Sequence, residues 1–221
     1  MILQYSIEKG FSSIGIDTDQ VNSTLKGYAK LDVTALDIKD NNSDNIDSRK
    51  FDNMIEMLQT GKKEQHFIID NGASTFIPLC AYIKENDVFS ILGEKYQLYV
   101  HTVITGGQAI TDTVNGLHSL ISNFDLPIVV WLNRYFGEID QDGKDFEKFK
   151  IYRENKDKIA SIIKIPLKNK QTFGRDLEEL FSRRQTFAEA LADESLPLMT
   201  RQRLRIWWGE VCVEMDKAQL I

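Results

Sequence analysis

Cysteine, histidine and proline are scarce in this chain of 221 residues, which has two cysteines, three histidines and four prolines. Cys80 and Cys212 are far apart in the sequence, and neither forms a Cys-x-x-Cys pair or lies in a Cys/His cluster. The histidines His66, His101 and His118 also lack the spacing of metal ligands. The sequence therefore argues against a Cys/His zinc site, and it predicts reduced, buried thiols in a cytosolic protein.

Long apolar runs are also absent. No run is long enough to span a bilayer, and the first residues lack the basic region and long apolar core of a signal peptide. The net charge of −6 argues against a protein whose main task is to coat DNA, because such domains usually carry a basic face. We therefore expect a cytoplasmic protein with no membrane span and no direct binding of nucleic acid.

Short apolar runs alternate with amphipathic stretches along the chain. This alternation is typical of an α/β fold in which helices flank a mostly parallel sheet. Several runs are rich in valine and isoleucine without alternating polar residues, as expected for strands buried on both faces. Strands are predicted at Ser12–Ile16, Val33–Ile38, His66–Ile69, Leu98–Ile104, Pro127–Leu132 and Ile159–Ile165.

The amphipathic stretches predict the helices. One is capped by Ser48 and stopped by Gly61, and the others span Ser74–Lys84, Gln108–Asn123, Asp145–Lys158, Gly174–Ala192 and Thr200–Lys217. The polar stretch Asp40–Asp47 is interpreted as a surface loop. Because no long linker and no internal repeat is present, we expect a single domain over residues 1–221, with C-terminal helices within residues 174–217.

Acidic residues follow two of the predicted strands. Asp17 and Asp19 end the first strand, and Asp70 ends the run Phe67-Ile68-Ile69. In open parallel sheets ligands bind at the carboxyl ends of the strands, where carboxylates can hold Mg²⁺ and orient an attacking water for phosphoryl transfer. The simpler alternative is that these aspartates only begin loops. Two such strand ends in this order favour the magnesium interpretation more than either does alone.

Three other motifs each have a functional and a structural interpretation. Asn133 ends an apolar strand and can bind a ligand or open a turn. Thr105-Gly106-Gly107 can cradle an anion or form a tight turn. The basic, aromatic stretch Thr200–Trp208 can dock on a membrane surface or a partner, or belong to a closing helix. The stripe of Leu204, Trp208, Val211 and Met215 favours packing on the body of the protein.

Taken together, these motifs are more specific than any of them alone. Gly15–Gln20 resembles the second-strand motif of ParA proteins. Beyond that motif, nearly the whole chain resembles the TraL family of conjugal transfer proteins, which belong to the ParA/MinD type of P-loop NTPases. The resemblance lies in Phe51–Met57, Ile69–Ser74, His101–Ala109, Asp112–Gly116, Val130–Asn133, Tyr152 with Asn155–Asp157, Phe173–Leu177 and Met199–Leu204.

The resemblance implies a cytoplasmic, nucleotide-binding protein of the ATPase type that acts in plasmid conjugal DNA transfer. It places Asp17 and Asp70 at the Mg²⁺ positions, Asp19 at the water-orienting, catalytic position, and Asn133 at the adenine position. ATP and Mg²⁺ are the cofactors expected for the full-length family. A nucleotide-dependent homodimer and other conjugative transfer proteins are the implied partners.

One part of the family pattern is missing from the sequence. Family members begin with a strand, a Gly-Lys-Gly-Gly-Val-Gly-Lys-Ser/Thr loop and a helix, and here Tyr5–Gly10 matches only the end of that helix. We therefore expect an N-terminally truncated chain without the first central strand and the phosphate-binding loop, with unpaired strand edges and low stability. The loop cradles the phosphates and supplies charge, so we expect weak nucleotide binding and negligible turnover.

The missing loop leaves two interpretations open. The chain can be a shortened form of an ATPase that acts in conjugation. Alternatively, it can be a non-catalytic interaction component of the transfer apparatus that keeps the fold surface and has lost nucleotide binding.

Overall fold

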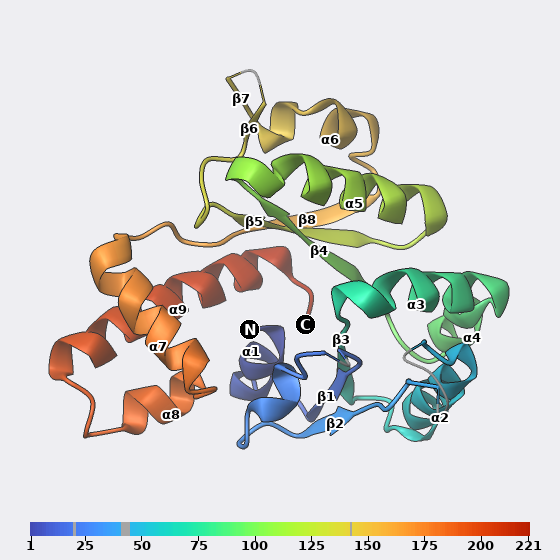
Figure 1. The fold of residues 1–221 in the computed structure, drawn as a ribbon, viewed down its shortest axis with the longest axis horizontal. Coiled ribbons are helices and arrows are strands. Elements are labelled where there is room, and N and C mark those ends of the chain that lie inside the picture. Colours follow the sequence, from blue (N-terminus) through green and yellow to red (C-terminus); the bar gives the residue numbers. More distant parts are fainter. Residues whose placement is uncertain (20, 41–44, 142) are drawn as a thin grey trace. The chain divides into compact units, whose positions relative to one another are not determined.

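The computed structural model describes residues 1–19, 21–40, 45–141 and 143–221. The chain folds into two compact units, drawn in Figure 1. The first unit holds Met1–Tyr96 and Arg175–Arg201, and the second holds Gln97–Gly174 and Gln202–Ile221. The chain therefore leaves the first unit and later returns to it. The prediction of a single domain over residues 1–221 stays a prediction.

The first unit is built on a three-stranded parallel sheet with the order β2-β1-β3. The central strand β1 (Ser13–Asp17) pairs with β2 (Val33–Ala35) on one side and with β3 (His66–Asp70) on the other. Ile16 of β1 is fully buried, as a central strand with helices on its faces requires.

Helices surround this sheet. They are α1 (Ile2–Glu8), α2 (Phe51–Thr60), α3 (Ala73–Glu85), α4 (Val88–Gly93), α7 (Arg175–Ser182) and α8 (Phe187–Ala192), with a 3₁₀ turn at Leu25–Gly27. The helix α2 buries Phe51, Met54 and Leu58, which share one face at helical spacing. The ammonium group of Lys95 donates hydrogen bonds to the backbone oxygens of Gln59 and Gly61 at 2.5 and 2.6 Å, and so caps the end of α2.

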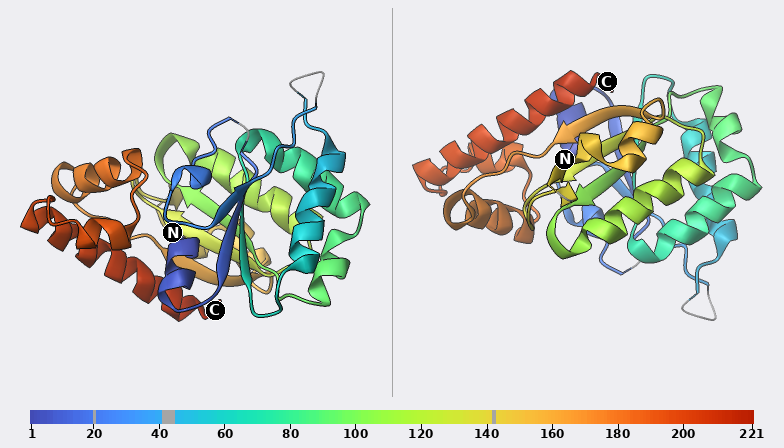
Figure 2. Two further views of the ribbon diagram at one scale, coloured as in Figure 1. Left: turned by 90° about the horizontal axis from the view of Figure 1, so that it is seen from below. Right: turned by 90° about the horizontal axis from the view of Figure 1, so that it is seen from above.

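The second unit holds another three-stranded parallel sheet, with the order β4-β5-β8. Its strands are β4 (Val100–Thr105), β5 (Ile128–Asn133) and β8 (Ile159–Lys164). The first five residues of the central strand β5 are buried, because it has a neighbour on each side and covered faces. The helix α5 (Ile110–Asn123) lies along one face of this sheet in Figures 1 and 2.

Three smaller elements complete the second unit. They are α6 (Lys150–Glu154) and the two-residue strands β6 (Asp140–Gln141) and β7 (Lys144–Asp145). The long helix α9 (Leu198–Ala218) begins in the first unit and continues in the second. Within the second unit, the indole of Trp207 donates a hydrogen bond to the backbone oxygen of Pro166 at 3.2 Å.

The structure confirms the α/β class with parallel sheets, and each of the six predicted strands is present within a few residues of its predicted bounds. The helix predictions need corrections. Gly174–Ala192 is two helices, because Arg184 adopts a left-handed conformation and Thr186 then starts α8 with a capping box. Asp47, not Ser48, accepts the capping hydrogen bond before α2. Asp145–Lys158 shrinks to the short α6 after a 3₁₀ turn.

Other parts of the chain were not predicted or cannot be compared. The helix α4 and the β6–β7 hairpin had no clear signal in the sequence. The predicted loop Asp40–Asp47 includes residues 41–44, which lie outside the described residues. In the parts of the chain that the structure describes, no helix is long and apolar enough to cross a membrane.

Each sheet has an open edge. Over the residues described, β3 pairs only with β1, and β4 pairs only with β5. Ile69 of β3 and Val103 of β4 are 37% and 46% exposed, which is high for isoleucine and valine in strands of parallel sheets. Unpaired edges were expected from the resemblance, and the further central strand that the resemblance implies stays a prediction.

Candidate functional site: an aspartate cluster at the carboxyl end of the first sheet

Asp17 and Asp70 end neighbouring strands of the first unit. Their Cα atoms are partners in the register between β1 and β3, so the two residues lie one strand spacing apart, about 4.8 Å. Asp19 follows Asp17 by two residues, in the loop that leaves β1. The fold thus brings together the three aspartates that the sequence singled out, at the edge of a parallel sheet where ligands usually bind.

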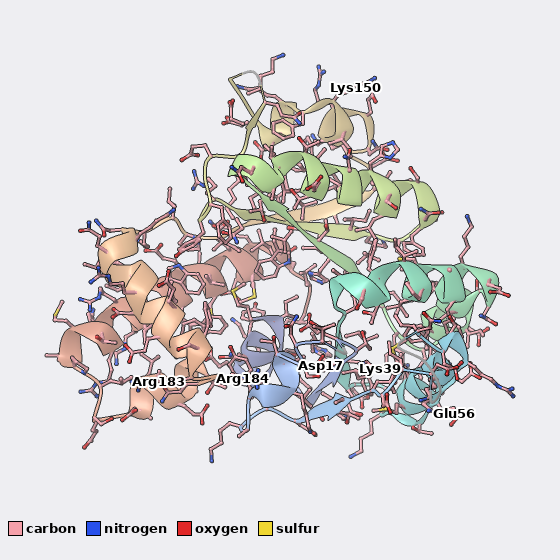
Figure 3. All side chains as sticks on the ribbon, viewed as in Figure 1. Asp17, Lys39, Glu56, Lys150, Arg183 and Arg184 are labelled. Atoms are coloured by element: carbon pink, nitrogen blue, oxygen red, sulfur yellow. The ribbon has the colours of Figure 1, made fainter. Side chains whose placement is uncertain are left out.

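Asp17 is held rigidly. Its residue is only 1% exposed, and Figure 3 labels it at the end of β1. Its Oδ1 accepts a hydrogen bond from the backbone N–H of Asp19 at 3.0 Å, and its Oδ2 accepts one from the backbone N–H of Lys26 at 2.8 Å. Both oxygens of this buried carboxylate thus have a hydrogen-bond donor, and the two donors fix its orientation.

Asp19 organises the loop. Its Oδ1 accepts hydrogen bonds from the backbone N–H groups of Val21 and Asn22 at 3.0 and 3.2 Å, and its Oδ2 accepts one from the Asn22 side chain at 3.2 Å. The hydrogen bond from Val21 is the main reason that the pKa of Asp19 lies below its usual value, with Asn22 adding to the effect. These hydrogen bonds therefore favour the charged form of the Asp19 carboxylate.

Gly72 gives the Asp19 carboxylate room to lie against the start of α3. A Cβ atom built on Gly72 would lie 2.6 Å from both Cγ and Oδ1 of Asp19, so a larger residue there would displace the carboxylate. Gly72 is the N-cap of α3, whose first turn carries partial positive charge. The negatively charged group that lies against this helix start is the carboxylate of Asp19.

Asp70 differs from Asp17 in its exposure and from Asp19 in the direction of its pKa shift. It is exposed, and it lines a cavity of about 170 Å³ in the first unit, whose other lining residues include Leu3, Leu25 and Phe181. Desolvation by these surroundings raises the pKa of Asp70, and the negative charge of Asp17 raises it further. The charge of Asp17 thus disfavours the charged form of Asp70, whereas the N-terminal ammonium of Met1 favours it. A cation bound between the two carboxylates would relieve their repulsion.

Asp70→Asn is therefore expected to make the ligand-free protein more stable at neutral pH. The raised pKa means that folded Asp70 holds its proton more tightly than unfolded Asp70, so stability falls as the pH rises from the unfolded value of 3.8 through the folded pKa. The gain in melting temperature is about 1–2 °C, because interactions of exposed charges are weak. Melting curves from pH 3 to 8 test it.

Asp70→Glu is the control for this prediction, since it keeps the negative charge and should show no gain in stability. The prediction is wrong if Asp70→Asn melts below the wild-type protein at pH 7, or if the difference between them does not shrink toward pH 3.

Asn133 belongs to the second unit. It ends β5, and its Oδ1 accepts a hydrogen bond from the backbone N–H of Tyr135 at 3.0 Å, so its side chain opens the turn after the strand. The prediction that Asn133 opens a turn is therefore confirmed for its side-chain oxygen. A role of Asn133 toward adenine stays a prediction.

The Thr105-Gly106-Gly107 motif is a tightly packed turn rather than an open anion cradle. A Cβ atom on Gly106 would overlap the backbone oxygen of Gly137 and lie 2.6 Å from that of Glu138. Gly107 and Gly137 both have positive φ angles, of 72° and 147°. The loops after β4 and β5 thus pack backbone against backbone. The backbone N–H of Gly106 also donates a hydrogen bond to Asn133, at 3.2 Å.

The apolar stripe of α9 is packed, as the sequence favoured. Leu204, Trp208, Val211 and Met215 are each at most 4% exposed. These side chains are therefore not a free surface for a membrane or a partner.

The donor set fits a magnesium ion that also binds phosphate. In the described part of the chain, no group of three or more His, Cys, Asp or Glu side chains could hold a metal ion. Mg²⁺ usually takes only one or two protein carboxylates, together with substrate phosphates and water. Asp17 and Asp70 meet that requirement at the end of neighbouring strands, whereas a fully protein-bound metal would need more ligands.

Sequence reasoning missed Lys26, whose backbone N–H holds Asp17, and Arg184, whose side chain lies against Gly27. Neither residue lies in a motif. The contact of Arg184 joins segments separated by more than 150 residues, so no local signal could have revealed it.

Comparison with known proteins gave two closely related matches. The chain is 45% identical over 224 residues to a protein of Escherichia coli named Protein TraL, and the match covers all of this chain and 91% of that protein. A second Escherichia coli protein of the same name is 45% identical over 223 residues, with the same coverage. No family model matches the chain, and no solved structure matches it.

Proposed function

This chain belongs to the TraL family, and from that premise we propose that it acts in plasmid conjugal DNA transfer as a cytoplasmic, nucleotide-binding protein of the ParA/MinD type. Its partners are then other proteins of the conjugative transfer apparatus, with nucleotide-dependent pairing of two copies as a family expectation. The identity of 45% over the whole chain supports the link to transfer. The nucleotide part of the proposal depends on the aspartate cluster.

The observation that carries the nucleotide proposal is the register of Asp17 and Asp70. Two carboxylates at the paired carboxyl ends of neighbouring parallel strands are a donor set for Mg²⁺ with phosphates, and they lie where such sheets bind ligands. The raised pKa of Asp70 beside Asp17 supports it, because functional sites often bring like charges together.

Each residue has a defined role in the proposal. Asp17 and Asp70 would hold Mg²⁺, and two backbone donors fix the orientation of the Asp17 carboxylate. Asp19 orients the attacking water, and its hydrogen bonds keep it ionised at neutral pH. When bound, Mg²⁺ supplies positive charge that neutralises the phosphates during phosphoryl transfer.

The sequence of 221 residues contains no Gly-x-x-x-x-Gly-Lys-Ser/Thr loop. Such a loop cradles the phosphates through its backbone N–H groups and its lysine, and loss of comparable charge stabilisation lowers the rate by about 10³-fold or more. We therefore expect weak binding of Mg-ATP and negligible turnover from these residues alone.

The absence of this loop from the sequence also favours a second candidate function. Without a phosphate-binding loop in the sequence, the chain can act as a non-catalytic component that binds other transfer proteins through its surface. The two candidates differ in one measurable property, which is whether Mg-ATP stabilises the folded chain.

Thermal unfolding with and without Mg-ATP tests the proposal. A ligand that binds only the folded state raises its stability, and with a dissociation constant of about 1 mM, roughly 10 mM Mg-ATP adds about 1.4 kcal/mol. We expect a rise in melting temperature of about 3–5 °C for the wild-type chain.

Two comparisons make the experiment specific. The rise should disappear in Asp70→Asn, and it should shrink when ATP is added with EDTA instead of Mg²⁺. Equal shifts in wild type and Asp70→Asn would show that any binding occurs elsewhere. No shift in the wild type at all would favour the non-catalytic candidate.

A further inference from the structure

Arg184 occupies an unusual position in the first unit. It lies between α7 and α8 with a φ angle of 49°, in the left-handed region that residues other than glycine rarely adopt. Its backbone N–H donates to the oxygen of Phe181 at 3.0 Å, and the N–H of Gln185 donates to Leu180 at 3.2 Å. These bonds close the last turn of α7, so Arg184 stands at a C-terminal position usually taken by glycine.

The side chain of Arg184 lies directly against Gly27. A Cβ atom built on Gly27 would overlap Cδ and Nη1 of Arg184 and would lie 2.6 Å from its Nε. The φ angle of Gly27 is not in the positive region. Its backbone conformation therefore does not require glycine. What demands glycine at position 27 is the space that the arginine takes.

Gly27 is the last residue of the 3₁₀ turn whose central residue, Lys26, binds Asp17. The Lys26 N–H donates to Oδ2 of Asp17 at 2.8 Å, and the Lys26 ammonium donates to the backbone oxygen of Val33 at 2.5 Å. The turn is therefore fastened to the aspartate cluster on one side and is covered by Arg184 on the other. A displacement of the turn would remove one of the two donors that orient the Asp17 carboxylate.

We propose that Arg184 is a positioning residue for Asp17, because its side chain holds the Leu25–Gly27 turn in the place from which Lys26 donates to the carboxylate. The proposal extends the proposed function, since Asp17 is there a Mg²⁺ ligand. It makes the α7–α8 segment a part of the metal site, although that segment contributes no carboxylate to it.

A second observation places α7 beside the same site. Phe181 of α7 and Tyr28, the residue after Gly27, both line the cavity that borders Asp70. Burial raises the pKa of Tyr28, and the positive charge of Arg184 acts against this rise, which indicates that the guanidinium lies near the hydroxyl group. The segment around Arg184 thus contacts the turn and also forms a wall next to Asp70.

The experiment measures two properties of the 221-residue chain in wild type, Arg184→Ala and Arg183→Ala. One is the hydrogen-exchange protection of the Lys26 amide, which reports its bond to Asp17 without any metal. The other is the affinity for Mn²⁺, a paramagnetic substitute for Mg²⁺, measured by electron spin resonance. Arg183 is the matched control, because it is the adjacent arginine and its side chain pairs with Glu179 of α7. Both arginines are labelled in Figure 3.

We expect Arg184→Ala to lower the protection of Lys26 by about tenfold or more and to weaken Mn²⁺ binding by about tenfold, as is usual when a residue behind a metal ligand is removed. Arg183→Ala should leave both unchanged. Arg184→Lys should restore both in large part, because its stem still covers Gly27. Unchanged protection of Lys26 in Arg184→Ala would overturn the proposal.

Gly27→Ala provides a variant that keeps the arginine. In the wild-type background its methyl group must displace Arg184, so it should reduce Lys26 protection as Arg184→Ala does. In the Arg184→Ala background the same change should have little further effect, and additive losses would contradict the proposed contact. If the wild type binds no Mn²⁺, the proposed function fails, while Lys26 protection still decides the role of Arg184.

Discussion

Gly106→Ala is expected to destabilise the second unit by about 3 kcal/mol or more. The added methyl group would overlap the backbone oxygen of Gly137 and lie 2.5 Å from its carbonyl carbon. Backbone atoms cannot move aside by changing a rotamer, so the two loops must separate, and overpacking of this kind is among the most destabilising changes. Because Gly106 also binds the backbone oxygen of Asn133, the turn that carries Asn133 should be displaced as well.

Tryptophan fluorescence during urea unfolding measures this effect selectively, because all three tryptophans, Trp131, Trp207 and Trp208, belong to the second unit. Gly116→Ala in α5 is the matched control. A Cβ atom there meets nothing within 4 Å, so alanine should stabilise the helix by about 0.5–1 kcal/mol. Equal stability of Gly106→Ala and wild type would show that the two loops do not pack as the structure has them.

Asp17→Asn is expected to lower the stability of the first unit by about 2–3 kcal/mol and to abolish binding of divalent cations. Asp17 is 1% exposed and accepts a backbone N–H on each oxygen. An asparagine has one oxygen and one NH₂ group, so one of those N–H donors would face another donor. A buried donor left without its charged acceptor costs about this amount.

Hydrogen exchange of the β1 amides reports this loss, since the first unit contains no tryptophan. The comparison with Asp70→Asn is the informative one. Both variants should lose Mn²⁺ binding, yet Asp17→Asn should destabilise the ligand-free chain and Asp70→Asn should stabilise it slightly. Tight Mn²⁺ binding by Asp17→Asn would remove Asp17 from the metal site, whatever its effect on stability.

The sequence predicted the strands well because their signal is local. Strand β5 reads Ile-Val-Val-Trp-Leu-Asn, and a central parallel strand needs such an unbroken apolar run. The break between α7 and α8 has one local signal, the capping-box pattern Thr186-x-x-Glu189, which the helix prediction did not use. Gly174–Ala192 keeps a helical pattern across Arg184, whose left-handed backbone closes the last turn of α7. Short elements such as α4 are equally hard to predict, since six residues carry little periodicity.

For the candidate site, the carboxylates could be predicted from the sequence, but the groups that orient them could not. Asp17 and Asp70 each end an apolar strand, and the rule that parallel strands share one carboxyl end places them together. The two groups that hold Asp17 could not be predicted, because a backbone N–H is present at every residue except proline and leaves no trace in composition. Residue type thus predicts which carboxylates meet, while the loop geometry determines how each one is oriented.

The interrupted first unit has a consequence for biosynthesis. Its strands and α1–α4 emerge from the ribosome with residues 1–96, but α7 and α8 follow only after residues 97–174 have been made. At about 5–20 residues per second, the wait from residue 96 to residue 201 is about 5–20 s. During that time the cavity beside Asp70 lacks its Phe181 wall, and Gly27 lacks the arginine that covers it. The nascent first unit therefore leaves the cavity beside Asp70 without this wall, and the contact of Arg184 with Gly27 forms only after residue 184 has been made.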